Sequence, residues 1–175
     1  MRILTIAAML PAVAGVACAQ PTVYFEPAEL LLEVGEPCEL DIRIDDGTDT
    51  LTCYLVEFTF DPDVVELTSA MEGSLFSESG HSTMFDWDVL GPGHHECNDV
   101  TLGFEAFVMC PGELARLFLE GVGAGTTTVS IETVDLRDIR RDPIVPVGAG
   151  ACHLTVGPDT GAEAGTETER DVLVC

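Results

Sequence analysis

The amino-acid sequence predicts an all-β protein: a jelly-roll-like, antiparallel sandwich of two sheets with about nine strands. Short stretches in it alternate apolar and polar residues with the period of two that is typical of half-buried strands. Glycine, proline and aspartate mark turns between these stretches, and no helical stretch separates them. Strands without intervening helices exclude a doubly wound parallel sheet.

The clearest strands are residues 38–46 and 53–60. The first, CELDIRIDD, alternates leucine and isoleucine with charged residues. The second, CYLVEFTF, places its aromatic residues and a valine on one face, which we expect to be buried. The opposite face of this second strand carries Leu55, Glu57 and Thr59.

The other strands are shorter or less regular. The candidates are residues 22–25, 64–70, 84–89, 99–109, 113–122, 126–136 and 152–156. In 113–122 (ELARLFLEGV) the charged residues have a helix-like spacing, but glycines bracket the segment and its neighbours are predicted strands. We therefore interpret it as a strand.

A turn is predicted where strand 53–60 ends, at Asp61-Pro62-Asp63. Proline lacks an N–H and ends strand pairing, while aspartate side chains accept hydrogen bonds from nearby backbone amides in turns. A catalytic carboxylate pair would need an enclosed cleft to raise one pKa, and a corner of a sandwich offers none. We interpret this segment as a corner between strands.

The charge balance is strongly acidic, with 31 aspartates and glutamates against 7 arginines and lysines, a net charge of −24. Such a surface repels nucleic acid and anionic membranes, because few side chains can neutralise phosphates. It is compatible with cations, neutral glycans or solubility in salt. A hydrophobic fraction of 46% is typical of a folded globular domain.

The ends of the chain differ from its middle. Residues 1–19 have the arginine, apolar run and Ala-x-Ala site of a secretory signal peptide, with cleavage before Gln20. An alternative is a lipoprotein tether through Cys18. Residues 20–158 then form the domain and 159–175 an acidic linker or tail. No later segment has the length of a membrane span, so we expect a secreted, extracellular or cell-envelope protein.

Three features have residue types used in binding sites. Residues 94–97 (HHEC) have metal-ligand types, but adjacent side chains of an extended chain point apart, which favours a polar loop with a disulfide cysteine. The aspartates within 41–49 could bind calcium, but their spacing does not match an EF-hand loop, which favours a solvated turn. Trp87 is predicted to lie in the core rather than stack on sugars. No catalytic motif is found, so we predict no enzyme, metal or cofactor.

Five segments follow one another in an order that resembles a cohesin domain of the carbohydrate-binding-module-like β-sandwich superfamily. The most specific piece is Phe60-Asp61-Pro62, within YLVEFTFDPDVVELTSAMEG. The other segments are LLLEVGEPCELDIRI, VTLGFEAF, GELARLFLEGVGAGTTTVSIETVDLRD and GACHLTVG. The resemblance covers about residues 21–157.

The resemblance implies a non-catalytic module that recognises a dockerin-like protein segment in extracellular or polysaccharide-degrading assemblies. In cohesins the partner docks on the exposed face of the sheet formed by the third, fifth, sixth and eighth strands. Carried onto this chain, that face presents Leu55, Glu57, Thr59, Asp86 and Asp88, with Leu55 as the apolar anchor. The alternatives are a carbohydrate-binding module and a structural envelope or spacer domain.

Disulfides are expected because six of the seven cysteines remain after cleavage, and an even number in an oxidising compartment favours pairing. In cohesin-like folds the third and sixth strands lie side by side, which would bring Cys53 opposite Cys110. Cys38 and Cys152 are the next candidate pair, because both begin strands that we expect to be near each other in the second sheet.

Overall fold

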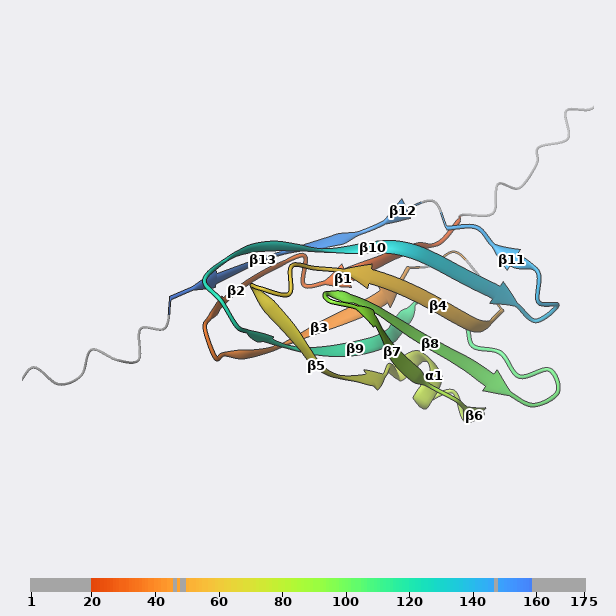
Figure 1. Ribbon diagram of the computed structural model, residues 1–175. Helices are drawn as coiled ribbons and strands as arrows, with labels where there is room; N and C mark the ends of the chain where they lie inside the picture. The colour runs from red at the N-terminus through yellow and green to blue at the C-terminus, as the bar shows by residue number, and fades with distance from the viewer. Residues whose placement is uncertain (1–19, 46, 48–49, 147, 159–175) are drawn as a thin grey trace, which may run out of the picture.

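The alternating stretches form strands of two facing β-sheets in the computed structural model, which describes residues 20–158 apart from 46, 48–49 and 147 (Figure 1). The smaller sheet has the order β12-β1-β3-β9-β5. Its strands are β12 (Gly148–Ala149), β1 (Thr22–Glu26), β3 (Pro37–Ile44), β9 (Gly112–Gly121) and β5 (Val65–Glu72). The predicted strand 113–122 is thus confirmed as β9.

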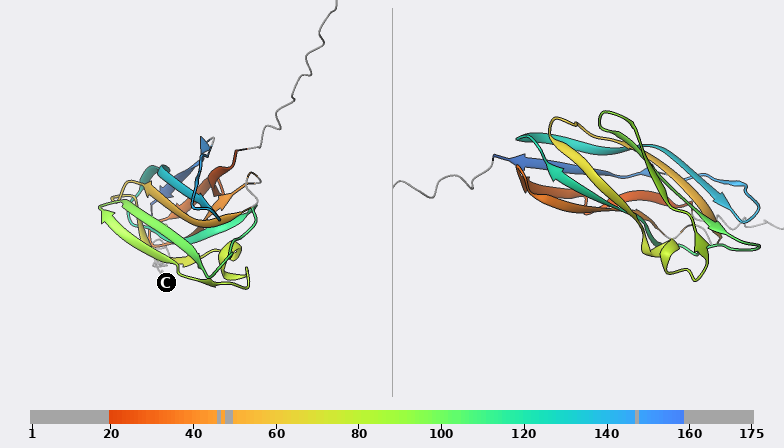
Figure 2. Two further views of the ribbon diagram at one scale, coloured as in Figure 1. Left: turned by 90° about the vertical axis from the view of Figure 1, so that its right-hand side faces the viewer. Right: turned by 60° about the horizontal axis from the view of Figure 1, so that its bottom comes forward.

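The larger sheet has the order β2-β13-β10-β4-β8-β6, with β11 beside β10 and β7 beside β8. Its strands are β2 (Glu29–Glu33), β13 (Ala151–Gly157), β10 (Gly125–Asp138), β4 (Leu51–Thr59), β8 (His94–Leu102), β6 (Ser82–Thr83), β7 (Asp86–Gly91) and β11 (Pro143–Ile144). One short helix, α1 (Ser74–Ser77), follows β5. Figure 2 shows the two sheets packed face to face.

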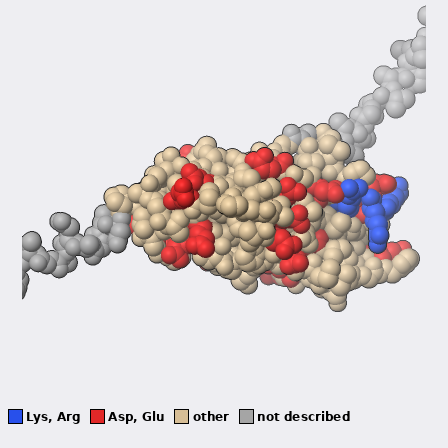
Figure 3. Space-filling view, viewed as in Figure 1, with Lys and Arg blue, Asp and Glu red and all other residues tan. Residues whose placement is uncertain are grey.

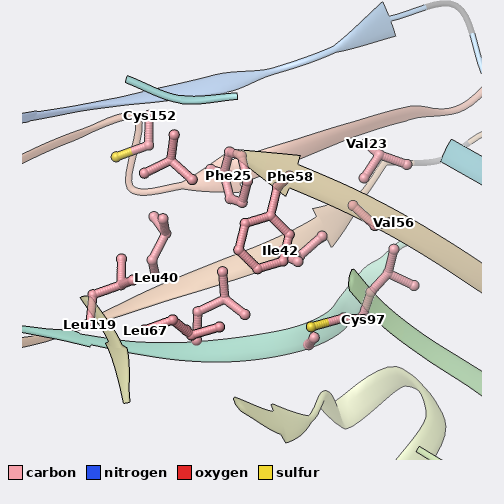
Figure 4. Close-up of a cluster of buried hydrophobic side chains, with 14 of the residues drawn as sticks. Val23, Phe25, Leu40, Ile42, Val56, Phe58, Leu67, Cys97, Leu119 and Cys152 are labelled. Carbon is pink, nitrogen blue, oxygen red and sulfur yellow. The ribbon is translucent and has the colours of Figure 1, made fainter. Parts of the chain in front are cut away.

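The core lies between the sheets and is built from the apolar face of each strand. Figure 4 shows side chains of both sheets pointing toward one another, among them Phe25 of β1 and Phe58 of β4. Their ring centroids are 6.2 Å apart in an edge-to-face arrangement, so this pair joins the two sheets. Phe58 is fully buried, as the alternation of residues 53–60 predicts.

The corner at residues 61–64 is confirmed. The backbone N–H groups of Val64 and Val65 donate to the carbonyl oxygen of Asp61 over 3.1 and 3.2 Å. The Asp61 carboxylate accepts a further hydrogen bond from the Asp63 N–H over 3.0 Å. These bonds close a turn that carries the chain from β4 in one sheet to β5 in the other.

The predicted two-sheet sandwich is confirmed and most strand pairs are antiparallel, but two pairs are parallel, so both sheets are mixed. β1 runs parallel to β12, and β2 runs parallel to β13. The cause is a switch of sheets at residues 27–28, which leaves β1 in the smaller sheet and sends β2 into the larger one. The His153 N–H donates to the Ala28 carbonyl over 2.8 Å at this crossing.

Two local predictions along β8 are also wrong. Residues 94–97, predicted as a loop, begin β8, where His95 and Cys97 point into the core and the strand pairs with β4. The predicted strand 99–109 ends at Leu102 instead. Gly103 has φ 130 and Glu105 has φ 58, and these left-handed conformations break strand pairing. Among the described residues, no helix is long and apolar enough to cross a membrane.

Candidate binding face

The outer face of strands β10, β4, β8 and β7 brings all five predicted site residues together. The register aligns Asp135, Leu55, Asn98 and Asp86 in one row across the four strands. The next row contains Thr133, Glu57, Glu96 and Asp88. Thr59 lies one pair further along β4, opposite His94. We call this surface the binding face.

Leu55 is the one apolar side chain in the two rows, and it lies near their middle. It is half-buried rather than fully exposed, because side chains of both neighbouring strands flank it. Asp86 and Asp88, on the outer strand β7, are exposed. A partly covered leucine surrounded by polar groups is typical of an interface anchor, since a partner can complete its removal from water.

Polar contacts hold the centre of the binding face. The Glu57 carboxylate accepts a hydrogen bond from the Thr133 hydroxyl over 3.2 Å. Its Oε2 also lies 3.4 Å from His94 Nε2, which is within ion-pair distance, but the two atoms are not aligned for a hydrogen bond. The Asn98 amide donates to Glu96 Oε1 over 3.1 Å. These contacts pre-order the side chains, which lowers the entropy lost when a partner binds.

The binding face is acidic. It carries the carboxylates of Glu57, Asp86, Asp88, Glu96, Glu132 and Asp135. Figure 3 shows acidic side chains spread along the molecule and arginines gathered at the end where β10 gives way to β11. A surface of this charge attracts a partner rich in lysine and arginine, mainly by speeding encounter.

A strongly perturbed carboxyl group lies beneath the binding face, and sequence reasoning missed it. Asp99 points inward from β8, opposite Tyr54, and is 1% exposed. Burial, together with the nearby Glu72 carboxyl, raises the pKa of Asp99 to about 7. Asp99 Oδ2 and Glu72 Oε1 are both buried, and neither has a hydrogen-bond donor among the described residues. A carboxyl and a carboxylate that share one proton would satisfy both atoms.

The histidines and Trp87 lie on two different faces of their strands. His94 is on the binding face, whereas His95 lies in the core and stacks against both Phe58 and Phe60, with centroid distances of 5.8 and 5.2 Å. Burial lowers the pKa of His95. Trp87 is half-buried and packs against the core, in agreement with its predicted place. Within the described ranges, no three metal-ligating side chains cluster.

The aspartates of the predicted solvated turn are only partly described. Asp45 accepts a hydrogen bond from the Thr22 N–H over 2.6 Å, and Asp41 forms an ion pair with Arg116 at 2.9 Å. Asp46 and Asp49 lie outside the described residues.

The cysteine register differs from the expected one. Cys53 lies opposite Val100 and Arg137, not opposite Cys110, because β8 ends at Leu102 and the chain returns to β4 only at a bridge between Val108 and Leu51. Cys38 and Cys152 do not share the second sheet as expected: Cys38 lies in β3 of the smaller sheet and Cys152 in β13 of the larger one. Burial raises the pKa of each thiol to about 11. Both proposed pairings stay predictions. The signal peptide with Cys18, and the tail from residue 159, lie outside the described residues.

Comparison with solved structures identifies the fold of the domain. No protein-family model and no curated protein matches the sequence. A non-cellulosomal cohesin from the hyperthermophilic archaeon Archaeoglobus fulgidus superposes with a TM-score of 0.65, at 14% identity, over 79% of this chain and 92% of that one. The seventh ScaB type I cohesin from Pseudobacteroides cellulosolvens superposes with a TM-score of 0.66, at 12% identity, over 84% and 98%. The domain has the cohesin fold.

A third cohesin fold of the same kind was solved with its partner. The sixth cohesin of scaffoldin B from Acetivibrio cellulolyticus, in complex with a Cel5 dockerin, superposes with a TM-score of 0.65, at 13% identity, over 79% of this chain and all of that one. The resemblance expected from Phe60-Asp61-Pro62 and its flanking strands is therefore confirmed at the level of the fold, across nearly the whole described domain.

Proposed function

We propose that this cohesin-fold domain is a non-catalytic recognition module that binds a dockerin-like protein segment on the binding face. The observation that carries the proposal is the placement of Leu55 among Glu57, Asp86 and Asp88 on one continuous sheet surface. Dockerin complexes of solved cohesins with the same fold support it.

The binding face suits a protein partner for two physical reasons. β4 and β8 are hydrogen-bonded on both sides, so the surface is rigid and little entropy is lost on docking. Leu55 provides a central apolar contact, and the six carboxylates around it provide charge complementarity to a basic partner. We expect the association rate to fall as salt screens these charges.

The proposal includes export. We infer that residues 1–19 direct the chain out of the cytoplasm, and that the domain acts in an extracellular or cell-envelope assembly. An assembly that degrades polysaccharide agrees best with dockerin partners.

The test is Leu55→Asp, assayed by calorimetry against a panel of purified dockerin modules and against proteins captured from the source organism's secreted fraction. Burying an aspartate at the centre of an interface should cost about 3 kcal/mol, or more than a hundredfold in affinity. Met71→Asp is the matched control, because Met71 is 58% exposed on β5 of the other sheet. Equal loss in both variants, or partner binding that survives Leu55→Asp, would show that the binding face is assigned wrongly.

Two outcomes would favour the other functions. Affinity for a neutral glycan that is indifferent to Leu55→Asp would indicate a carbohydrate-binding module. A stable monomer that binds neither dockerin modules nor glycans would indicate a structural spacer.

A further inference from the structure

A cleft of about 540 Å³ lies at one end of the binding face, in the row beyond Leu55. That row contains Arg137, Cys53 and Val100, and its pairs are two residues along from those of Leu55, a distance of about 7 Å. Cys53 and Val100 line the cleft between two walls. Glu105 belongs to one wall, and Ile139 and Arg141 belong to the other. The cleft is therefore continuous with the binding face.

Both walls contain a strained backbone position. Glu105 (φ 58) and Arg141 (φ 66) are the non-glycine residues with positive φ in the described part of the chain, and both line this cleft. The Arg141 conformation is fixed by Asp138, whose carbonyl accepts the Arg141 N–H over 2.8 Å and whose Oδ1 accepts two further backbone N–H groups. Glycine adopts this conformation without strain. Strain of this kind gathers at functional sites, and here it favours a role for the arginine side chain.

Arg141 has an available charge in a chain of net charge −24. Arg43 and Arg116 are held in ion pairs on the smaller sheet, and Arg137 pairs with Asp135 over 2.7 Å. No carboxylate of the described residues lies at ion-pair distance from Arg141.

The guanidinium of Arg141 acts on the floor of the cleft. Burial raises the pKa of the Cys53 thiol, and the charges of Arg137 and Arg141 oppose that rise. Figure 3 shows a group of basic side chains at this end of the molecule. A guanidinium with no ion pair among the described residues, beside Cys53 and Val100, is suited to a carboxylate on a short apolar stem.

We propose that the cleft receives an acidic side chain of the protein partner, its carboxylate on Arg141 and its stem on Cys53, Val100 and Ile139. The identity of the ligand as a protein group rests on the proposed function, because a partner that covers Leu55 also reaches the adjacent row. Glu105 repels a carboxylate from the opposite wall and so directs it to Arg141. The partner surface is thus basic over the carboxylates of the binding face and acidic at this one end.

The first test needs no partner. We would titrate the isotope-labelled protein with N-acetyl-aspartate α-amide and follow backbone amide signals by NMR, with N-acetyl-asparagine α-amide as the neutral control. The aspartate probe should shift amides of residues 52–53, 100–101 and 137–141 with a dissociation constant on the order of 10 mM, and the neutral probe should not. Arg141→Gln should abolish the shifts, and Glu105→Gln should tighten binding about threefold. Arg116→Gln, on the other sheet, should change nothing.

Arg141→Gly separates a binding role from a structural one. It should abolish the titration while leaving Tm unchanged or raising it by about 2–4 °C, because glycine relieves the strained φ. Three results would refute the carboxylate site: a marked fall in the Tm of Arg141→Gly, amide shifts that persist in Arg141→Gln, or no shifts in the wild type. A glucuronate affinity at least about tenfold above that of the peptide probe would assign the site to an acidic glycan and overturn the protein ligand.

The two proposals fail in different ways. Leu55→Asp should leave the probe titration intact, whereas Arg141→Gln should weaken binding of a dockerin-type partner only about tenfold. If partner binding depends on Leu55 but the aspartate probe does not bind, only the carboxylate site in the cleft is refuted. If the protein binds the aspartate probe but no dockerin module, the proposed function is wrong and so is the assignment of the ligand to a protein partner. The carboxylate site in the cleft would then still stand.

Discussion

Asp99 and the half-buried Glu72 each bury one carboxyl oxygen, and this buried pair predicts an unusual pH dependence of stability. The two groups link β8 of the larger sheet to β5 of the smaller one, and Tyr54 lies opposite Asp99. The folded-state pKa of Asp99 is about 7, against an ordinary value of 3.8. Because the folded state binds the proton more tightly than the unfolded state, stability is fully present below the ordinary pKa and falls as pH rises through the folded pKa.

The size of the effect follows from this difference. Between about pH 5.5 and about pH 8.5, linkage gives a loss of about 2 kcal/mol in the free energy of unfolding. Carboxyl groups with ordinary pKa values are already ionised in this range, so they add little to the slope. The direction is opposite to that of a salt-bridged aspartate, whose contribution is lost on acidification.

The perturbation is Asp99→Asn, measured by urea unfolding at the two pH values. An asparagine amide can donate to Glu72 as the protonated acid does, but it does not titrate. The variant should match the wild type near pH 5.5, lose little stability toward pH 8.5, and there exceed the wild type by about 2 kcal/mol. Parallel pH profiles of the two proteins would refute the shared proton.

Two further predictions concern single contacts. Gly93→Ala should destabilise the fold by more than about 2 kcal/mol, because Gly93 has φ 62 and an added Cβ would lie against the Phe60 carbonyl oxygen. Gly80→Ala, at φ 78 with no atom within 4 Å of its Cβ, should cost only about 1 kcal/mol. Equal costs of the two substitutions in thermal unfolding would contradict the clash. Tyr54→Phe should lower the free energy of unfolding by about 1–2 kcal/mol, because the Tyr54 hydroxyl donates to the Leu114 carbonyl over 2.6 Å in the core. The control Tyr24→Phe should not change stability. A Tyr54→Phe variant that is as stable as the wild type would show that this hydrogen bond contributes nothing.

The sequence predicts those parts of the fold in which residue type reveals burial. β4 is the best case, since its buried positions are leucine, valine or aromatic and its half-buried positions are mostly polar. β8 could not be predicted in the same way, because its buried positions are His95, Cys97, Asp99 and Thr101. Their burial depends on stacking, on a shared proton and on tertiary hydrogen bonds, which a hydropathy pattern does not show.

The binding face was predictable only as far as strand parity extends. Parity places Leu55 beside Glu57 and Thr59, and the family resemblance adds Asp86 and Asp88. The cleft depends on a loop after β8 and a turn after β10, whose residues Glu105 and Arg141 are far apart in the chain. One signal was nevertheless present: Arg137, Arg140 and Arg141 form the only cluster of basic residues in this acidic sequence.

β8 contributes to both the binding face and the buried pair, and its alternation separates their functions. Glu96 and Asn98 point outward to the binding face, while Asp99 points inward to Glu72. We therefore expect ionisation of Asp99 to cost stability without altering the outer rows, because hydrogen bonds to β4 and β7 hold β8 on both sides. Partner affinity should be insensitive to Asp99→Asn at a pH where both proteins are folded. A change in affinity that follows the buried pair instead of Leu55 would mean that the two faces of β8 are coupled.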